Sequence, residues 1–359
     1  MKKIFLSILA IAALASCSKS DVIFEQENEI GLLPATKNVT KISGTSGTLA
    51  DTQELGVWAY WDNDGTVETN VTSYANYNSD YLVNALFAKK SGSWAGSGEA
   101  YPWPVNGSLV FAGYTTQTDN VFPLTSTEGA TSVSYALSTD EMTFTNYNYD
   151  NTTEFDLCWF GRTSASYNYR TVTTNNSVPV TLSHALTWIT IKVYGEGTPV
   201  DNWTITSMNL KNVVTKGTGT CTGTTTTTSL TNENPDGSTT TTTVVTPATT
   251  VWTAVTTTET YPIFNGSTTI DDVDNIKELS NNVIIPSLPL KLIISFTYTV
   301  QGQEKTEYKE VDLKLDANNT IKWKSGVHYT YTLKFTGNEI LVSPVYGGWD
   351  TKNETITVE

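Results

Sequence analysis

The chain has 359 residues, of which 38% are hydrophobic and 16% are charged, with 24 glycines. These proportions are those of a folded protein with more than one domain, and they exclude a wholly disordered chain. The formal net charge is −15, and Arg162 and Arg170 are the only arginines, so no basic face for nucleic acid can be assembled. Two histidines and three cysteines exclude a His-rich or Cys-rich metal centre, and no metal or cofactor is expected.

The first 17 residues have the pattern of a bacterial lipoprotein signal. A basic start at residues 1–3 is followed by an apolar stretch, residues 4–14, that is too short to span a membrane. The sequence Leu-Ala-Ser-Cys at 14–17 looks like a lipobox, which predicts removal of residues 1–16 and lipid attachment to the thiol of Cys17. An ordinary signal peptide is the alternative. Several acyl chains on Cys17 would hold the protein at the outer membrane.

Residues 17–50 form a lipidated N-terminal strand and linker in this interpretation. Apolar residues within 21–33 predict one short strand, and the polar residues that follow predict an exposed linker. From residue 55 onward, apolar segments of strand length alternate with turn clusters, which is typical of sandwiches and barrels. A polar break at 175–177 sets the predicted boundary, so that residues 51–178 form a first domain and residues 179–359 a second.

The segment 180–193 changes its pattern midway. Its apolar residues have even numbers as far as Trp188 and odd numbers from Ile189 onward, so the strand should bend or bulge and serve two sheets. Farther along, residues 290–300 and 329–335 alternate regularly between apolar and polar, as half-buried strands do. The predicted fold class is therefore all-β.

The threonine-rich stretch 222–258 is interrupted by Asn-Pro-Asp-Gly at 234–237. Because threonine favours strands and those four residues favour a turn, the stretch predicts a long polar hairpin with the turn at its tip. A disordered or glycosylated threonine tract is the alternative. In either case the stretch is not expected to contribute much apolar surface to a core.

Residues that could carry catalysis are few and isolated. His184 lies on the apolar, even-numbered face of its strand, which favours a buried structural histidine, and His328 stands at the start of a later strand. No nucleophile elbow or Ser-His-Asp arrangement is present. The acidic stretches 62–65 and 271–274 are typical of turns and solvated loops rather than of calcium loops. The chain is therefore not expected to be an enzyme.

Tryptophans and cysteines are assigned to the interior. Most of the tryptophans lie on alternating strand faces, which favours core positions over a sugar-stacking platform: Trp58, Trp61, Trp94, Trp103, Trp159 and Trp188. Cys158 and Cys221 fall on opposite sides of the predicted boundary, so two buried free thiols are favoured over a disulfide. A glycan-binding surface remains the alternative use of the aromatic residues.

Several short motifs together resemble the fimbrillin family, which comprises the lipoprotein-derived type V pilins and their minor fimbrial relatives. They are the lipobox at Cys17 and residues 55–60, 101–104, 109–114, 183–191, 283–286, 326–331 and 349. Their order covers nearly the whole mature chain. The resemblance implies two β-sandwich domains of transthyretin-like character in tandem, export through the periplasm as a lipoprotein, and assembly with other pilin subunits at the cell surface.

The resemblance also implies strand exchange. In pilins of this family a protease removes the N-terminal strand, and a strand donated by a neighbouring subunit fills the open groove. Such an addition satisfies both the free backbone edges and the apolar pockets of the groove. The displaced strand would contain Val22, Phe24, Ile30 and Leu32. The donor would come from the C-terminal tail, with Ile340, Val342 and Val345 or with Ile356 and Val358.

The linker departs from the family pattern. Shaft subunits resemble one another in being cut after an arginine there, but this sequence has no arginine before Arg162, so Lys37 and Lys41 are the basic candidates for cleavage. The predicted function is a fimbrial structural subunit that supports adhesion. The alternative is a fimbrial anchor, a tip component or a non-polymerising surface lipoprotein that binds a glycan or a host protein.

Overall fold

The computed structural model describes residues 24–36, 53–64, 66–90, 93–117, 132–148, 156–172, 177–196, 203–233, 239–246, 248–270, 275–288, 290–316, 318–336, 340–348 and 354–355. Within these ranges the chain forms strands, turns and irregular connections, and no α-helix occurs. The all-β fold class predicted from the sequence is confirmed. No helix in the described ranges has the length and apolarity needed to cross a bilayer.

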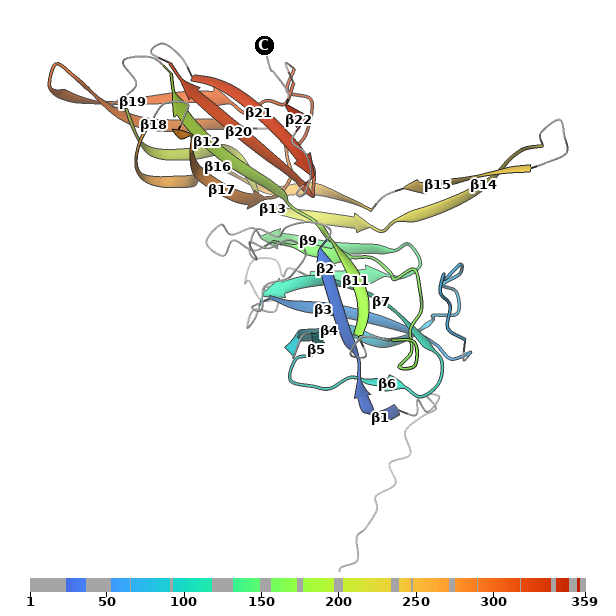
Figure 1. Cartoon of the computed structure of the whole chain (residues 1–359). Coiled ribbons are helices and arrows are strands. Elements are labelled where there is room, and N and C mark those ends of the chain that lie inside the picture. Colours follow the sequence, from blue (N-terminus) through green and yellow to red (C-terminus); the bar gives the residue numbers. More distant parts are fainter. Residues whose placement is uncertain are drawn as a thin grey trace, which may run out of the picture.

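The N-terminal half of the molecule is a closed barrel (Figure 1). Around the barrel the strands follow the order β10-β11-β2-β5-β4-β3-β7, and the ring closes because β10 pairs with both β7 and β11. The resemblance implied a sandwich here, whereas the hydrogen bonding closes on itself. The strands are β2 (Gly31–Thr36), β3 (Gln53–Asp62), β4 (Ser79–Lys90), β5 (Ser93–Gly96), β7 (Ser108–Gln117), β10 (Cys158–Phe160) and β11 (Ser177–His184).

A two-stranded ribbon lies beside the barrel. It consists of β1 (Phe24–Glu29) and β6 (Pro102–Pro104), which pair antiparallel with an irregularity between Glu25 and Glu29. Just after β1, the backbone N–H of Ile30 donates to the carbonyl of Tyr101 at 2.7 Å. These contacts place the first described strand across one end of the barrel and lead the chain into β2.

The C-terminal half consists of two sheets packed face to face. One sheet has the order β17-β12-β20-β21-β22, and the other has the order β19-β18-β13-β9-β8 with β16 also paired to β13. The first contains β17 (Lys277–Ile284), β12 (Thr187–Gly195), β20 (Val327–Phe335), β21 (Ile340–Gly348) and β22 (Glu354–Thr355). The second contains β19 (Gln303–Asp312), β18 (Lys291–Val300), β13 (Thr204–Thr222), β9 (Glu141–Asn148), β8 (Ser132–Ala136) and β16 (Thr249–Thr269).

Alternating side chains fill the space between the two sheets. Ile189 and Ile191 of β12 are at most 1% exposed, as are Leu333 of β20 and Ile294 of β18. All belong to one cluster of buried hydrophobic residues. Because successive residues of a strand face opposite sides, the alternating pattern seen in the sequence is the direct cause of this packing. Each fully buried aliphatic side chain contributes roughly 2 kcal/mol of burial free energy.

The chain passes from the barrel to the C-terminal sheets between β11 and β12. Residues 177–184 pair with β10 and β2 in the barrel, so residues 179–184, which the sequence assigned to the second domain, belong to the barrel. Residues 187–195 pair with β17 and β20. The change of phase in the sequence therefore lies close to the passage between two sheets, but the chain makes this passage with two separate strands, β11 and β12, rather than with one bent strand. Strands β8 and β9, which precede this crossing in the chain, also reach the second half, because β9 pairs with β13.

The threonine-rich stretch forms the predicted hairpin. β14 (Thr225–Glu233) and β15 (Thr239–Thr246) pair antiparallel, and the tip between them lies outside the described residues. Among the described strands these two pair only with each other, and Figure 1 shows the ribbon extending away from the body of the molecule. The hairpin thus adds length to the molecule without joining either half.

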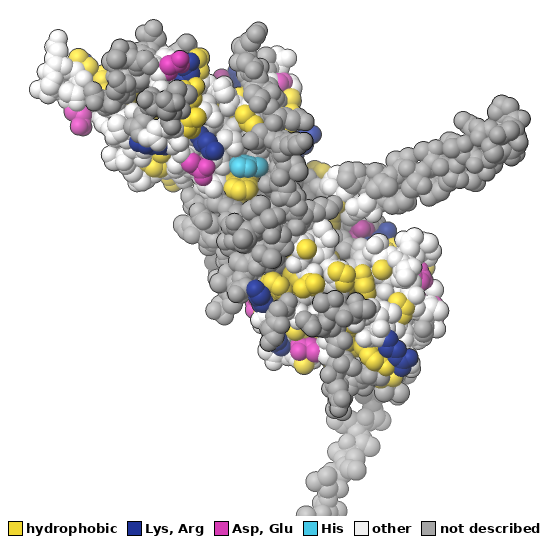
Figure 2. Space-filling view, viewed as in Figure 1, with side chains coloured by type: hydrophobic (Ala, Val, Ile, Leu, Met, Phe, Trp, Pro, Cys, Tyr) yellow, Lys and Arg dark blue, Asp and Glu magenta, His cyan; other side chains and the backbone are white. Residues whose placement is uncertain are grey.

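The surface carries its charges singly. On the face shown in Figure 2, the described Lys, Arg, Asp and Glu side chains are scattered, and hydrophobic side chains gather in a row over the lower half of the molecule. The described basic side chains therefore form no broad patch on this face.

Candidate functional site

Strand β2 is the part of the barrel on which the strand-exchange prediction depends. It lies between β11 and β5 in the barrel order. With β11 it pairs in parallel over its whole length, from Gly31 opposite Ser177 to Thr36 opposite Leu182. With β5 it shares only the two antiparallel pairs that Gly31 and Leu32 make. β2 is therefore an interior strand that is firmly held on one side and briefly held on the other.

The apolar side chains of this segment fill the barrel core. Ile30 and Leu32 are 0% exposed, and they belong to the same buried cluster as Val178, Val180 and Leu182 of β11. Leu33, on the opposite face, is 39% exposed. The alternation of Leu32 and Leu33 is what a strand between a core and solvent requires. Removal of this strand would leave two open backbone edges and an apolar hollow.

The other predicted N-terminal residues are placed only in part. Phe24 begins β1, where its backbone is opposite Pro104 of β6. Val22, the lipid-attachment residue Cys17 and the candidate cleavage residues lie outside the described residues. These candidate cleavage residues are Lys37 and Lys41. Of the predicted displaced strand, the structure therefore brings Ile30 and Leu32 into the barrel.

The predicted donor residues lie at the opposite end of the chain. In β21, Ile340 and Val342 are partly buried against the C-terminal core, and Val345 is half-buried. β21 pairs with β20 along its whole length and, at Val345 and Tyr346, with the short β22. Ile356 and Val358 lie outside the described residues. Two of the five predicted donor residues thus contribute to the core of their own subunit.

The aromatic residues confirm their predicted place in the interior. Five of the six tryptophans are at most 8% exposed: Trp58, Trp61, Trp94, Trp103 and Trp159. Trp188 is half-buried and stacks on His328, with ring centroids 3.9 Å apart. Burial, with a smaller effect of the Lys192 charge, lowers the pKa of His328 to about 4. Five of these six tryptophans are therefore core residues, and the sixth packs against a histidine.

Three residues with reactive side chains meet inside the molecule. Asp156 precedes β10, Cys158 begins it, and His184 ends β11, where it is paired with Cys158. The Nδ1 atom of His184 lies 2.9 Å from Oδ2 of Asp156 and 3.3 Å from the sulfur of Cys158. All three residues are at most 5% exposed. His184 is thus a buried, hydrogen-bonded histidine, as its place on an apolar face predicted.

This buried cluster lacks the geometry of a nucleophilic triad. A triad places the nucleophile and the carboxylate on opposite ring nitrogens, whereas here both contact Nδ1. Burial, followed by the charge of Asp156, raises the pKa of the Cys158 thiol well above its usual value, so the thiol stays protonated and weakly nucleophilic. Asp, Cys and His are ligands that zinc accepts, and the ligand atoms lie within 4.8 Å of one another. Among the described residues, this cluster is the group that could hold a metal.

Both cysteines of the described chain are free and buried, as expected from the sequence. Burial raises the pKa of Cys221 to about 12, and the hydroxyl of Thr250 donates to its sulfur at 3.4 Å. Cys221 lies on β13, opposite Thr250 of β16. Neither thiol therefore has the lowered pKa that a reactive cysteine needs.

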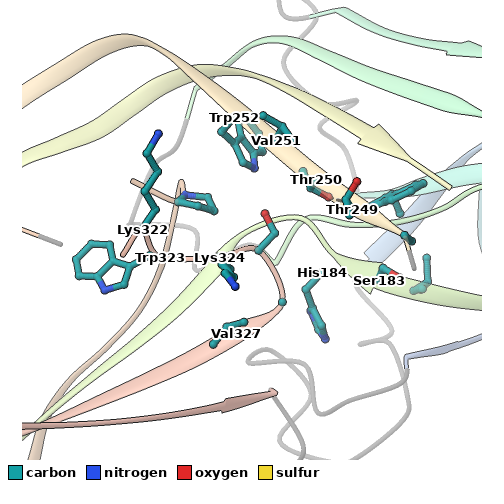
Figure 3. A pocket seen from close by; sticks show the side chains of 16 residues that line it. Ser183, His184, Thr249, Thr250, Val251, Trp252, Lys322, Trp323, Lys324 and Val327 are labelled. Carbon is teal, nitrogen blue, oxygen red and sulfur yellow. Dashed lines mark hydrogen bonds between the residues drawn. The ribbon is translucent and has the colours of Figure 1, made fainter. Parts of the chain in front are cut away.

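A cavity of about 520 Å³ lies beside the buried cluster, where β11, β16 and the loop before β20 meet (Figure 3). His184 lines it from β11 and Trp252 from β16, with Trp323 on the opposite side. The indole N–H of Trp252 donates to the carbonyl of Ala185 at 2.7 Å, and that of Trp323 donates to the hydroxyl of Tyr331 at 2.8 Å. These bonds fix both indoles to the protein, so the aromatic walls belong to the core.

Sequence reasoning missed the cluster: it considered His184 and Cys158 separately and did not single out Asp156. Asp156 and Cys158 are two residues apart, the spacing that puts side chains on one face of an extended segment. That spacing was the available signal. His184 joins them because β10 and β11 are neighbours in the barrel, and that pairing has no counterpart in local sequence.

Comparison with known proteins places the chain in a family. The model of the fimbrillin-like family matches residues 40–349. The fold is similar to the crystal structure of a fimbrial protein from Bacteroides vulgatus, with a TM-score of 0.54 and 17% sequence identity over 89% of this chain and 99% of that chain. A structure from Bacteroides uniformis matches with a TM-score of 0.47 and 16% identity over 89% and 99% of the two chains. No curated protein matches the sequence.

Proposed function

Because the chain belongs to the fimbrillin-like family, we propose that it is a structural subunit of surface fimbriae, exported as a lipoprotein and assembled by exchange of a β-strand. The family match supports the fimbrial class, and the fold is similar to that of the Bacteroides vulgatus fimbrial protein. The lipobox at Cys17 supports travel to the outer membrane with lipid on its thiol. Its partners in this function are other fimbrial subunits.

The position of β2 is the observation that carries the assembly mechanism. Cleavage after Lys37 or Lys41 would separate β1 and β2 from the rest of the chain. Loss of these strands would expose the edges of β11 and β5 and the core space now filled by Ile30 and Leu32. An extended segment from another subunit satisfies both needs together, because its backbone pairs with the edges and its alternate side chains enter the hollow.

The donor comes from the C-terminal tail in this mechanism. Ile356 and Val358 alternate with threonines. This is the pattern required by the space that β2 would leave between β11 and β5, which we call the slot. Residues 340–345 are the other candidate donor, but Ile340 and Val342 already pack against the core of their own subunit. Donation of the segment after 353 therefore disturbs the folded subunit less than donation of β21.

The second candidate function is an anchor, a tip component or a non-polymerising surface lipoprotein. The observation that favours it is the linker, which has lysines but no arginine. If β2 is never removed, the barrel stays closed and the subunit cannot accept a strand at this slot. Such a protein would act through a surface that binds a glycan or a host protein.

Intact mass and N-terminal sequencing of the protein from the cell surface test the proposal. A mature start just after Lys37 or Lys41 is expected for a polymerising subunit. A lipidated start at Cys17 in all of the surface protein would contradict removal of the strand and favour the second candidate. Cys17→Ala should accumulate as unprocessed precursor, and lipid labelling that persists in this variant would overturn the anchoring claim.

A further inference from the structure

A second cavity, of about 840 Å³, lies on the outer side of the barrel, and no residue of β2 lines it. Its wall includes Arg162, which follows β10, together with Tyr74 from the connection between β3 and β4, and Thr181 from the outer face of β11. Its volume is within the range of about 300–1,000 Å³ that small-molecule sites occupy. We propose that this cavity binds a carboxylate-bearing sugar, such as a uronic or sialic acid residue of a glycan.

Arg162 is held with its face on an aromatic ring. The centre of its guanidinium lies 3.9 Å from the ring centroid of Tyr74, and the Tyr74 hydroxyl donates to the carbonyl of Thr163 at 2.9 Å, which fixes the ring. Stacking of this kind leaves the N–H edge of the guanidinium available for a planar anion, which it can bind with two parallel hydrogen bonds. The side chain is 21% exposed, so the charge is partly shielded from water.

The donors of this guanidinium are only partly used. Among the described residues, it donates one hydrogen bond, from Nη1 to the carbonyl of Leu137 at 2.8 Å. Its Nε lies 3.9 Å from Oδ2 of Asp140, which is too long for a hydrogen bond. The other oxygen of Asp140 accepts from the Tyr135 hydroxyl at 2.8 Å and from the backbone N–H of Arg162 at 2.7 Å. Asp140 therefore positions the arginine and leaves its Nη2 for a ligand.

The rest of the wall suits a sugar rather than an aliphatic acid. Exposed hydroxyl side chains surround the arginine: Thr72, Ser164, Thr181 and Thr224. Hydroxyls both donate and accept, so they match the hydroxyls of a pyranose ring, while the aromatic side chain of Tyr167 offers an apolar surface. An acidic peptide would satisfy Arg162 but would leave most of these hydroxyls to water.

The charge of the protein makes this site distinctive. The chain has a net charge of −15 and only two arginines, yet one of the two lines this polar cavity. A general attraction for anions is therefore absent, and binding must depend on the local fork of Arg162. The inference extends the surface role proposed above, because a fimbrial or surface subunit meets glycans.

The test uses the chain that begins at residue 17, which has lost the signal peptide and still contains β2. It also uses matched pairs of ligands. Methyl glycosides of glucuronic, galacturonic and sialic acid are titrated by calorimetry, each beside a neutral counterpart in which a hydroxymethyl group replaces the carboxylate. At least one acid is expected to bind tenfold or more tightly than its counterpart. Binding of no member of the panel, or equal binding within every pair, would overturn the proposal. Tighter binding of N-acetylglutamate than of every sugar acid would overturn the sugar class.

Matched variants locate the binding. Arg162→Met should weaken the preferred sugar acid at least tenfold. Arg170→Met is the control, because Arg170 also lies near a tyrosine ring, 5.0 Å from the Tyr169 centroid, but does not line the cavity. Thr181→Trp fills the cavity from an exposed strand position, so it should remove binding while the thermal unfolding temperature stays within a few degrees of wild type.

These outcomes are independent of fibre assembly. If Thr181→Trp is folded and still binds as wild type does, the cavity is not the site and the proposal fails, even where Arg162→Met has unfolded. Because binding is measured on the uncleaved monomer, such a failure leaves the proposed strand exchange unaffected. Conversely, loss of polymerisation in a slot variant with unchanged sugar binding separates the two functions.

Discussion

Strands β2 and β21 lie near opposite ends of the described chain and are held in opposite ways. β2 is an interior strand of the barrel, paired with β11 on one side and with β5 on the other, and Leu32 on its inner face is 0% exposed. Among the described residues, β21 is bordered on the side away from β20 only by the two residues of β22, and its Leu341 is 42% exposed. One strand completes a core, and the other lies near the edge of a sheet.

In the strand exchange proposed above, this difference would give the two strands different roles. Loss of an interior strand exposes core side chains to water, which costs burial free energy. It also leaves the backbone groups of two neighbouring strands without hydrogen-bond partners. Extension or release at a sheet edge exposes much less. The barrel end is therefore suited to accept a strand, and the C-terminal end is suited to offer one.

The strongest way to break this comparison is to place a charge in the slot. Leu32→Asp puts a carboxylate among apolar side chains, so the free energy of unfolding should fall by about 4 kcal/mol. Urea denaturation followed by tryptophan fluorescence measures it. Leu33→Asp is the control, because Leu33 is 39% exposed and should change stability by no more than about 0.5 kcal/mol. Equal losses in the two variants would mean that β2 does not occupy the barrel as described.

The part of the barrel wall formed by β10 and β11 should be the region next most sensitive to substitution. Asp156→Ala removes the acceptor of the 2.9 Å contact to His184 and leaves a hollow next to β10 and β11, so a loss of about 3 kcal/mol is expected. Asp156→Asn keeps the shape and one acceptor oxygen and should lose about half as much. Thermal unfolding monitored by circular dichroism gives the ranking. Wild-type stability in Asp156→Ala would show that the buried cluster does not support the barrel wall.

Acid should weaken the C-terminal sheet through His328. Its folded pKa is lowered to about 4 from the usual 6.5, chiefly by burial, so between these values the unfolded chain binds a proton that the folded chain does not. The stabilisation is fully present above pH 6.5 and is lost as the pH falls through 4. After allowance for partial exposure, the loss is roughly 2 kcal/mol.

Comparison of urea denaturation at pH 7 and pH 4 measures this effect. His328→Gln has no ionisable group at this position. Between pH 7 and pH 4 its free energy of unfolding should therefore fall by roughly 2 kcal/mol less than that of wild type. Residues of the barrel provide the internal reference, because the barrel contains no part of the Trp188–His328 stack. Identical pH profiles for the two proteins would contradict a buried neutral His328.

The features predicted from the sequence are those with a local signal. The phase change near Trp188, the two strands of the threonine-rich stretch and the alternating faces of β18 and β20 each depend on neighbouring residues, and each has its counterpart in the structure. The burial of five tryptophans follows from the same alternation. Local periodicity determines which face of a strand is buried, and it is readable without knowledge of the partners.

The features that were missed depend on pairing between distant segments. Gly31 pairs with Ser177 across almost 150 residues of sequence, and nothing in either segment specifies that partner. Closure of the barrel depends on β10, which has only three residues and gives too weak a pattern to predict. The approach of His184 to Asp156 follows from this closure. Arg162 was noted only for its rarity, because the cavity around it forms from six separate parts of the chain.

The smallest expected change in stability, and the sharpest test of the donor, comes from the tail. β22 makes only two pairs with β21, so deletion of residues 354–359 should change the free energy of unfolding by less than about 1 kcal/mol while it weakens polymerisation. Ile356→Lys with Val358→Lys should act in the same way, since these residues share one face, whereas Thr355→Lys with Thr357→Lys alters the other face and should have less effect. Polymers that survive mild detergent and collapse on boiling, resolved by electrophoresis, give the measurement. Unchanged polymers in the first pair would remove Ile356 and Val358 from the donor role and direct the search to β21, whose release would expose Ile340 and Val342.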